Sequence, residues 1–380
     1  MDLVEDWKTN LDRCVRCGLC RFACPTLLEG TPGWESTGPR GKMLMLKAYR
    51  SGEAEANEFM VKELYTCTLC CHCKEICPCD IDVCKVFEEA REELNEKGKA
   101  PLKQHSIFVS SIERNYNPYS EPHKDRLKKL HKNSSAKKNP EVIYFTGCTA
   151  AYRHSEIFRA TQKIMRHAGV DFTVLDDEWC CGSPLLRVGE RTLAEKMARH
   201  NVDQVRCQSA KTVVFACAGC YMTFRNDYPN LLGEDLGFKV LHMTEFLDMI
   251  MSDGKLKLGS VKPTRVTYHD PCHLGRYSKI YESPRRLLQS IPEVKLVEMG
   301  YNREDALCCG GGGGLKSAFN KLALNIAERR VRQAVETGAE MLVSSCPFCK
   351  TNLKDADSKK NHRIRIVDLM ELIAESVQSA

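Results

Sequence analysis

The sequence contains no long hydrophobic segment. Its most apolar helical candidate, residues 243–251 (MTEFLDMIM), is short and carries Glu245 and Asp248. A helix that crosses a bilayer needs about 20 predominantly apolar residues, so we expect no transmembrane segment. The first residues, MDLVEDWK, are acidic and do not lead into an apolar stretch, which argues against a secretory signal. We therefore expect a cytoplasmic protein.

The sequence also lacks a strong charge imbalance. Lys and Arg total 56 and Asp and Glu total 50, so the net charge is +6 over 380 residues. This charge is too small to predict a nucleic-acid partner. Fingerprints for a flavin or a nicotinamide cofactor are missing as well. The chain is therefore expected to be neither a complete oxidase nor a self-sufficient reductase.

Cysteine, in contrast, is abundant, with 22 residues. Such a number would suggest a disulfide scaffold in a short secreted chain. This chain is long enough for two or three domains at roughly 150 residues each, and it shows no secretory signal. We therefore expect the cysteines to be reduced and to serve as metal ligands.

The first hundred residues contain two copies of one cysteine run, C-x2-C-x2-C-x3-C-P. In two-cluster ferredoxins this spacing lets three thiolates of one run bind a [4Fe–4S] cluster while the fourth reaches the other cluster. A zinc site is the alternative, but two complete copies of the run disfavour it. The predicted ligand sets are Cys14, Cys17, Cys20 and Cys77 for one cubane cluster, and Cys67, Cys70, Cys73 and Cys24 for the other.

Between these runs, residues 40–67 have the straight-chain residues and apolar spacing of a helix. The first module is therefore expected to be helical and built around metal. Four cysteines fit no ligand position, and we interpret them as small buried residues. They are Cys71, Cys79, Cys84 and Cys207.

The remainder of the chain contains an internal repeat. The matched segments are residues 141–148 with 265–272, residues 179–182 with 307–310, and residues 212–220 with 341–349. Strands and helices alternate in each half, which predicts an open α/β structure with a mainly parallel sheet. In such folds ligands bind at the carboxyl ends of the strands, where Cys148, Cys217, Cys272 and Cys346 fall. We expect the two halves to face each other across a pseudo-twofold axis.

These patterns predict the domain organisation. Residues 118–140 are rich in Lys and Arg and are flanked by proline, which is typical of a solvated linker; a basic docking surface is the alternative. The predicted order is a helical di-[4Fe–4S] ferredoxin domain at 1–117, a basic linker at 118–140, a first α/β domain at 141–256 and a second at 257–380.

Each α/β half contains five cysteines that include a vicinal pair followed by glycine. The sets are Cys148, Cys180, Cys181, Cys217 and Cys220 in the first half, and Cys272, Cys308, Cys309, Cys346 and Cys349 in the second. Five thiolates are one too many for a cubane cluster. The glycines, Gly182 and those at 310–314, allow positive φ angles and a close approach of backbone N–H groups to sulfur. A phosphate loop at 310–314 is disfavoured because the Lys-Ser/Thr ending is missing.

At this point the sequence resembles a known family. The duplicated five-cysteine pattern, with YFTGCTAAY, DEWCCGSPLLRVGE, YHDPCHLGRY and CPFCKTNL, is similar to the cysteine-rich CCG domain found in the catalytic polypeptides of heterodisulfide reductases. A ferredoxin module fused to two CCG domains resembles the D subunit of the heterodisulfide reductase of methanogens, and the resemblance covers nearly the whole chain.

The resemblance implies a function. Each five-cysteine set would hold a noncubane [4Fe–4S] cluster, with the vicinal pair bridging irons. A disulfide such as coenzyme M–S–S–coenzyme B would be reduced between the two noncubane clusters, with electrons relayed by the two cubane clusters. The implied partner is a redox subunit, either a membrane cytochrome b or a soluble flavoprotein, so the cytoplasmic chain could associate with a membrane through that partner.

Other residues near the motif cysteines are candidates for substrate contact. Arg153, Arg187 and Arg276 could bind substrate anions, although Arg is common on any surface. His154, His269 and His273 could supply protons; structural histidines, or histidines that tune the cluster potential, are the alternatives. Trp179 and Phe348 are expected to shield the clusters from water.

Other functions remain open. A free cysteine of Cys217/Cys220 or Cys346/Cys349 could perform thiol–disulfide exchange. CCG domains also occur in electron-relay subunits of glycolate, lactate and glycerol-3-phosphate dehydrogenases, and in a sulfite-reduction subunit that acts on a protein trisulfide. A structural iron–sulfur scaffold is the last alternative. The relay subunits often lack part of a cysteine set, so ten filled positions favour disulfide chemistry.

Overall fold

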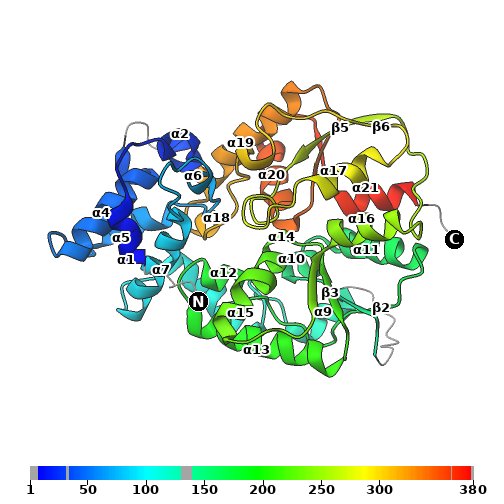
Figure 1. Cartoon of the computed structure of the whole chain (residues 1–380), viewed down its shortest axis with the longest axis horizontal. Helices are drawn as coiled ribbons and strands as arrows, with labels where there is room; N and C mark the ends of the chain where they lie inside the picture. Colours follow the sequence, from blue (N-terminus) through cyan, green and yellow to red (C-terminus); the bar gives the residue numbers. More distant parts are fainter. Residues whose placement is uncertain (1–6, 31–33, 130–138, 361, 378–380) are drawn as a thin grey trace.

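The N-terminal module is helical and forms the left side of the molecule in Figure 1. The computed structural model describes residues 7–30, 34–129, 139–360 and 362–377. The module comprises α1 (Trp7–Arg13), α2 (Cys20–Ala23), α3 (Pro25–Glu29), η1 (Glu35–Thr37), α4 (Pro39–Ser51), α5 (Glu58–Tyr65), α6 (His72–Glu75), α7 (Val83–Glu96) and α8 (Lys103–Asn115). Its core includes Trp7, Leu46, Leu64 and Phe87.

The single helix predicted over residues 40–67 is in fact two helices, α4 and α5. Gly52 ends α4 in the left-handed conformation, with φ +78°, which glycine adopts without a steric penalty. Asn57 begins the next helix because its side chain accepts a hydrogen bond from the Met60 N–H, as N-cap residues do. Local capping therefore overrides the continuous helical propensity.

The first α/β half contains a four-stranded parallel sheet in the order β2-β1-β3-β4. Its strands are β1 (Val142–Phe145), β2 (Phe172–Thr173), β3 (Thr212–Phe215) and β4 (Lys239–His242). Its helices are α10 (Cys148–Tyr152), α11 (Ser155–His167), α12 (Ser183–Leu186), α13 (Arg191–Cys207), α14 (Ala218–Met222), η3 (Thr223–Asp227), α15 (Tyr228–Leu232) and α16 (Met243–Ser252). Strands buried on both faces, such as Val142–Phe145, account for the continuous apolar runs in the sequence.

The second half repeats this topology in the order β6-β5-β7-β8, again with parallel pairing. Its strands are β5 (Thr264–His269), β6 (Val294–Leu296), β7 (Met341–Ser344) and β8 (Arg365–Asp368). Its helices are α17 (Glu282–Gln289), η4 (Arg303–Asp305), α18 (Leu315–Ala318), α19 (Asn320–Glu336), α20 (Pro347–Lys360) and α21 (Leu369–Ser376). The duplicated α/β fold predicted from the sequence is confirmed.

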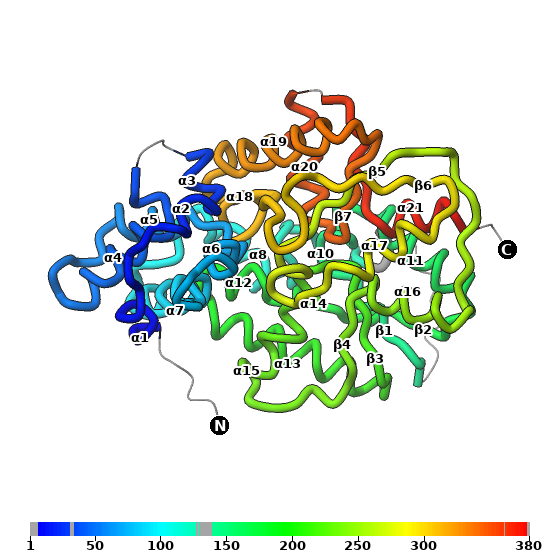
Figure 2. The backbone as a smooth tube through the Cα atoms, turned by 45° about the horizontal axis from the view of Figure 1, so that its top comes forward, coloured from blue at the N-terminus to red at the C-terminus, as the bar shows by residue number. Residues whose placement is uncertain are grey.

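The two halves pack against each other through helices, as the tube in Figure 2 shows. Helix α11 lies against α21 and α16 against α17, and buried residues of both halves, such as Phe158 and Leu369, share one hydrophobic cluster. Lys163 also donates a hydrogen bond to the Ala374 carbonyl at 2.7 Å. The halves are therefore held in a fixed relation, with the carboxyl ends of their strands available to form a common site.

The segment predicted as a basic linker lies partly outside the described residues, at 130–138. Its described start forms η2 (His123–Asp125) and α9 (Arg126–Lys129). Arg126 is buried and forms a 2.8 Å ion pair with Glu178 of the first half. The solvated character predicted for this segment therefore does not extend to Arg126. Within the described ranges, no helix has the length and apolar composition needed to cross a membrane.

Candidate metal centres

The two ferredoxin runs line two separate pockets of the N-terminal module. One pocket collects the three leading cysteines of the first run and the last of the second: Cys14, Cys17, Cys20 and Cys77. The other collects the complementary four: Cys67, Cys70, Cys73 and Cys24. This exchange of the fourth cysteine is the arrangement that two-cluster ferredoxin spacing predicts. The first pocket reaches the surface at Cys17, which is exposed.

The chemistry of these donors fits iron–sulfur clusters. Burial raises the pKa of Cys67 to about 11, and burial together with the neighbouring cysteines raises the pKa of Cys20 to about 11. Thiols held so close together therefore stay protonated unless a cation offsets their charge. Bound iron supplies that charge and deprotonates its ligands.

The five cysteines of the first α/β half converge at the carboxyl end of its sheet. Cys148 follows β1 and begins α10, the vicinal pair precedes α12, and Cys217 and Cys220 lie at the start of α14. Their thiols contact one another in sequence, from Cys148 through Cys180, Cys181 and Cys220 to Cys217. The structure therefore brings the whole predicted set together.

The second half gathers its set in the same way. Cys272 follows β5 and contacts Cys308, which contacts Cys309, and the contacts continue through Cys349 to Cys346. One backbone N–H, that of Gly310, donates to the Cys308 sulfur at 3.3 Å.

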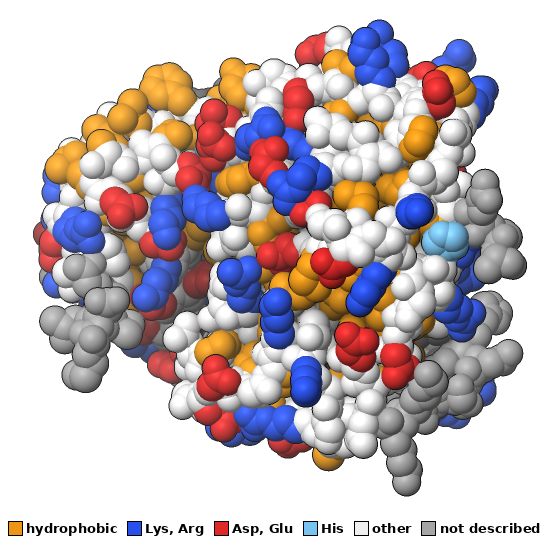
Figure 3. Space-filling model, turned by 45° about the vertical axis from the view of Figure 1, so that its right-hand side comes forward, with side chains coloured by type: hydrophobic (Ala, Val, Ile, Leu, Met, Phe, Trp, Pro, Cys, Tyr) orange, Lys and Arg blue, Asp and Glu red, His pale blue; other side chains and the backbone are white. Residues whose placement is uncertain are grey.

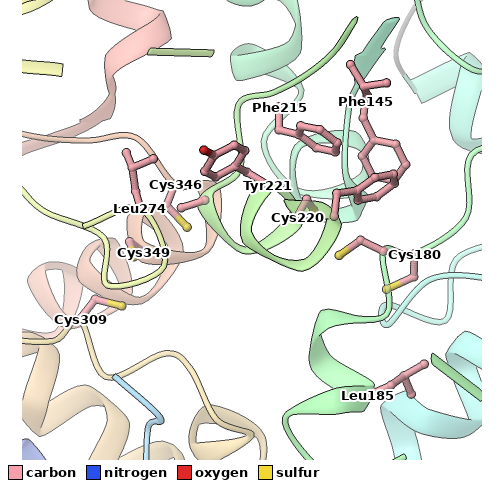
Figure 4. Close-up of a cluster of buried hydrophobic side chains, with 14 of the residues drawn as sticks. Phe145, Cys180, Leu185, Phe215, Cys220, Tyr221, Leu274, Cys309, Cys346 and Cys349 are labelled. Atoms are coloured by element: carbon pink, nitrogen blue, oxygen red, sulfur yellow. The ribbon is translucent and has the colours of Figure 1, made fainter. Parts of the chain in front are cut away.

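The two sets meet at one point, where the thiols of Cys217 and Cys346 contact each other. Figure 4 shows Cys309, Cys346 and Cys349 on one side, Cys180 on the other, and Cys220, a residue of α14, between them. The ten cysteines therefore form a single two-part site at the junction of the halves.

The second set also contacts the N-terminal module, because the Cys308 thiol touches that of Cys70. The glycine run makes this contact possible. A Cβ atom at Gly312 would lie 2.8 Å from the Thr68 carbonyl oxygen, and one at Gly313 would lie 2.3 Å from the Cys67 carbonyl oxygen, closer than such atoms approach. We did not expect this packing from the sequence. The positive φ angles expected at 310–314 occur only at Gly310, Gly313 and Gly314.

Two of the predicted anion-binding arginines are engaged by protein partners. Arg187 is buried and pairs with Glu88 of α7 and with Asp227. Arg276 is buried and donates to the Cys70 carbonyl at 2.6 Å and to the Ala306 carbonyl at 2.7 Å. Each guanidinium thus joins the N-terminal module to an α/β half, and among the described residues the Arg187 Nε and the Arg276 Nη2 have no hydrogen-bond partner.

The other predicted substrate residues lie in varied surroundings. Arg153 is half-exposed, pairs with Glu121 at 2.9 Å and lies over the Tyr119 ring. The two imidazole nitrogens of His154 contact Glu156 at 2.9 Å and Thr351 at 2.8 Å, which links the halves.

His273 lies beside the junction of the two sets. A Cβ atom placed on Gly219 would be 3.5 Å from its Nδ1 and 3.8 Å from the Cys217 sulfur. Burial and the nearby Arg187 charge lower the pKa of His273 to about 4, so its ring is neutral at pH 7.

The two aromatic residues expected to shield the clusters have different neighbours. Trp179 is sandwiched between Tyr116, at a ring distance of 3.8 Å, and His200, at 3.6 Å. Phe348 packs closely against Gly311.

The four unassigned cysteines do not share one environment. Cys71 and Cys84 are buried as predicted, and both line the pocket of the second cubane set. Cys79 is only half-buried, and Cys207 is exposed. The prediction of burial is therefore wrong for Cys207, which lies at the end of the amphipathic helix α13.

Arg91 of α7 is a residue that the sequence did not single out. It is fully buried, and its guanidinium donates hydrogen bonds to four backbone carbonyls. The acceptors are Arg187 at 2.6 Å, Gly313 at 3.0 Å, Leu64 at 2.7 Å and Cys67 at 3.2 Å. Its only sequence signal is an arginine on the apolar face of a helix. Arg91 thus connects the module to both halves.

Comparisons with known proteins agree with this architecture. Residues 10–81 match the family model of a 4Fe-4S dicluster domain, and residues 142–225 and 266–354 each match that of a cysteine-rich domain, CCG. The N-terminal module is thus a dicluster domain that binds 4Fe–4S clusters.

Among curated relatives, the D subunit of the dihydromethanophenazine:CoB–CoM heterodisulfide reductase of Methanosarcina acetivorans is 38% identical, over 97% of this chain and 94% of the relative. The B subunit of the fumarate reductase (CoM/CoB) of Methanothermobacter marburgensis is 31% identical, over 97% and 73%. The EtfAB:quinone oxidoreductase of Syntrophomonas wolfei is 26% identical, over 99% and 60%. A solved structure of a hypothetical protein from Helicobacter pylori has a TM-score of 0.58, with 11% identity over 100% of this chain and 74% of the other; it shows the fold alone.

Proposed function

This chain belongs to the family of heterodisulfide reductase D subunits, which are iron–sulfur oxidoreductase subunits, and we propose that it is the catalytic subunit that reduces a disulfide. The substrate would be coenzyme M–S–S–coenzyme B or a similar compound. Two cubane [4Fe–4S] clusters would occupy the N-terminal module, and two noncubane [4Fe–4S] clusters the five-cysteine sets.

The observation that carries this proposal is the contact between two complete sets at Cys217 and Cys346. Reduction of a disulfide consumes two electrons and two protons and releases two thiols. Two one-electron centres on either side of the junction would supply the electrons. The chain's own residues position the junction: Cys217 lies immediately before α14, Cys346 lies in the loop after β7, and His273 lies beside them.

The contacts also support an order for the proposed electron transfer. The Cys14 set reaches the surface, the Cys24 set lies within the module, and Cys70 of that set touches Cys308. The second five-cysteine set would therefore receive electrons before the first. Buried Arg91 and Arg276 would maintain this path by holding the loops that carry Cys67 and Cys70.

Turnover with the heterodisulfide tests the function. We expect the anaerobically purified chain to contain about sixteen irons, four for each cluster, and to release two thiols per coenzyme M–S–S–coenzyme B in the presence of reduced viologen. Cys346→Ser should abolish thiol release, whereas Cys207→Ser, at an exposed cysteine outside the sets, should leave it unchanged.

Four other outcomes would each contradict the proposal. Eight irons with alkylatable CCG cysteines would show that the five-cysteine sets hold no clusters. Turnover only with a flavin dehydrogenase partner would show an electron-relay subunit, and release of sulfide from a protein trisulfide would show a sulfite-reduction subunit. Thiol release that persists without iron would instead show exchange by a free cysteine.

The entry point for electrons is predicted at the loop of the first cubane set. The side chains of Val15, Leu19 and Phe22 are exposed by 66%, 46% and 78%, and they come from the same run of residues as the exposed Cys17. On the face drawn in Figure 3, hydrophobic side chains gather over the N-terminal module at the upper left. An exposed apolar patch of this kind is typical of a docking surface. A redox partner seated here, a membrane cytochrome b or a soluble flavoprotein, would contact the outermost cluster.

Phe22→Glu is expected to slow reduction of the chain by its native redox partner at least about tenfold, the change that 1.4 kcal/mol produces, because a charge would enter an apolar interface. Reduction by viologen should not change. Ile107→Glu is the matched control, since Ile107 is 74% exposed on α8, a different helix of the same module. Equal partner-driven rates in the two variants would place the docking surface elsewhere.

A further inference from the structure

The two halves differ at one position beside their cysteine sets. His269 ends β5 and precedes Cys272 by three residues, and Phe145 ends β1 and precedes Cys148 by the same number. Both side chains are buried, with exposures of 1% and 0%. The second half therefore places an imidazole where the first half places a phenyl ring.

The proton of this imidazole can be assigned from its neighbour. Buried Arg330 of α19 donates from Nε to His269 Nδ1 at 3.1 Å. It also donates to the Tyr301 carbonyl at 2.7 Å and to Gln333 at 3.0 Å. A guanidinium has no acceptor atom, so Nδ1 must be the acceptor. Neutral His269 therefore carries its proton on Nε2.

This Nε2–H group has no hydrogen-bond partner among the described residues, although it is buried. A buried donor without a partner destabilises the folded state. An imidazole nitrogen of His269 and the sulfurs of Cys309 and Cys349 all lie within 4.8 Å of one another. Since Arg330 engages Nδ1, Nε2–H is the donor of the ring that is left for these sulfurs.

We propose that His269 donates this hydrogen bond to the thiolate of Cys309 or Cys349 and thereby gives the second cluster a higher reduction potential than the first. The inference rests on the proposed cluster in this set. A hydrogen bond to a ligand thiolate stabilises the more negative, reduced state of a cluster. Phe145 offers no such donor to the first set. The set that touches the N-terminal module at Cys70 is thus the stronger electron acceptor of the two.

Three substitutions separate this role from packing. Asn places its oxygen where Nδ1 lies and keeps the acceptor for Arg330, but its amide does not reach the sulfurs. Gln extends an N–H donor to about the position of Nε2. Phe gives the second half the side chain that the first half has at Phe145.

The test is an EPR-monitored redox titration of the anaerobic full-length chain, with the second-site signal identified as the one lost in Cys309→Ser. We expect the midpoint potential of that signal to fall in His269→Asn and His269→Phe and to be largely retained in His269→Gln. Potentials unchanged in all three variants would overturn the proposal. A loss of about four irons in His269→Asn would show that His269 is a ligand instead, which also overturns it.

Pulsed EPR of the wild-type chain gives a second measurement that does not depend on variant folding. With 15N-labelled histidine, we expect weak nitrogen coupling and an exchangeable proton near the second-site signal; strong nitrogen coupling would show ligation. Neither measurement requires a substrate. Failure to reduce a disulfide would contradict the proposed function but not this inference. Absence of any second-site signal would show that the second set holds no cluster, which contradicts both.

Discussion

Replacing Arg91 by leucine is expected to lower the free energy of unfolding by about 3–5 kcal/mol. The fully buried guanidinium donates to carbonyls in three parts of the chain: the N-terminal module, the first half at Arg187 and the second half at Gly313. Each buried carbonyl left without a donor costs about 1–3 kcal/mol, and partial relaxation reduces the sum. The module should then separate more easily from both halves.

Anaerobic urea unfolding measures this loss. Arg50→Leu is the matched control because Arg50, also on a helix of the module, is more than one-third exposed and pairs with exposed Asp12. Such surface pairs contribute about 0–1 kcal/mol. Arg91→Lys keeps the charge but loses the planar guanidinium, so its free energy of unfolding should lie between those of Arg91→Leu and the wild type. A stability change for Arg91→Leu no larger than that of Arg50→Leu would show that the four bonds do not hold the module in place.

The cysteine sets were predictable from the sequence because iron–sulfur ligands follow short, fixed spacings. The repeat matched Cys148 with Cys272, and the apolar strands before them indicated where those cysteines would lie in a parallel sheet. The structure gathers the sets as predicted, including the placement of Cys24 and Cys77 in the opposite pockets. Such local patterns are predictive because the cysteines of each five-cysteine set come from segments of the same half.

The contacts between domains were not predictable in the same way. Arg276 and Cys70 are 206 residues apart, and no periodicity in the sequence relates them. An arginine just after a motif cysteine suggested an anion site, whereas in the structure its Nε and Nη1 atoms donate hydrogen bonds to backbone carbonyls. A contact between domains also explains the long glycine run of the second half. Its glycines let the Thr68 backbone approach closely, which the vicinal cysteines alone would not require.

Gly313→Ala is expected to slow electron transfer from the N-terminal module to the second five-cysteine set by roughly tenfold or more. A Cβ atom at Gly313 would lie 2.3 Å from the Cys67 carbonyl oxygen and 2.7 Å from the Thr68 carbonyl carbon. The backbone that carries Cys67 and Cys70 must therefore move away from Cys308. Displacements of about 1 Å at a reacting contact can cost about 100-fold, and overpacking of this kind destabilises by roughly 1–3 kcal/mol.

Gly254→Ala separates this effect from backbone strain. Gly254 has φ +73°, close to the +63° of Gly313, but a Cβ atom there meets nothing within 4 Å. Both variants share the cost of a left-handed alanine, about 1–2 kcal/mol; only Gly313→Ala adds the collision with Cys67. Stopped-flow mixing with reduced viologen would resolve reduction of the module from reduction of the CCG sets. Equal internal rates in the two variants would mean that electrons do not cross at the Cys70–Cys308 contact, since that contact is the one Gly313→Ala displaces.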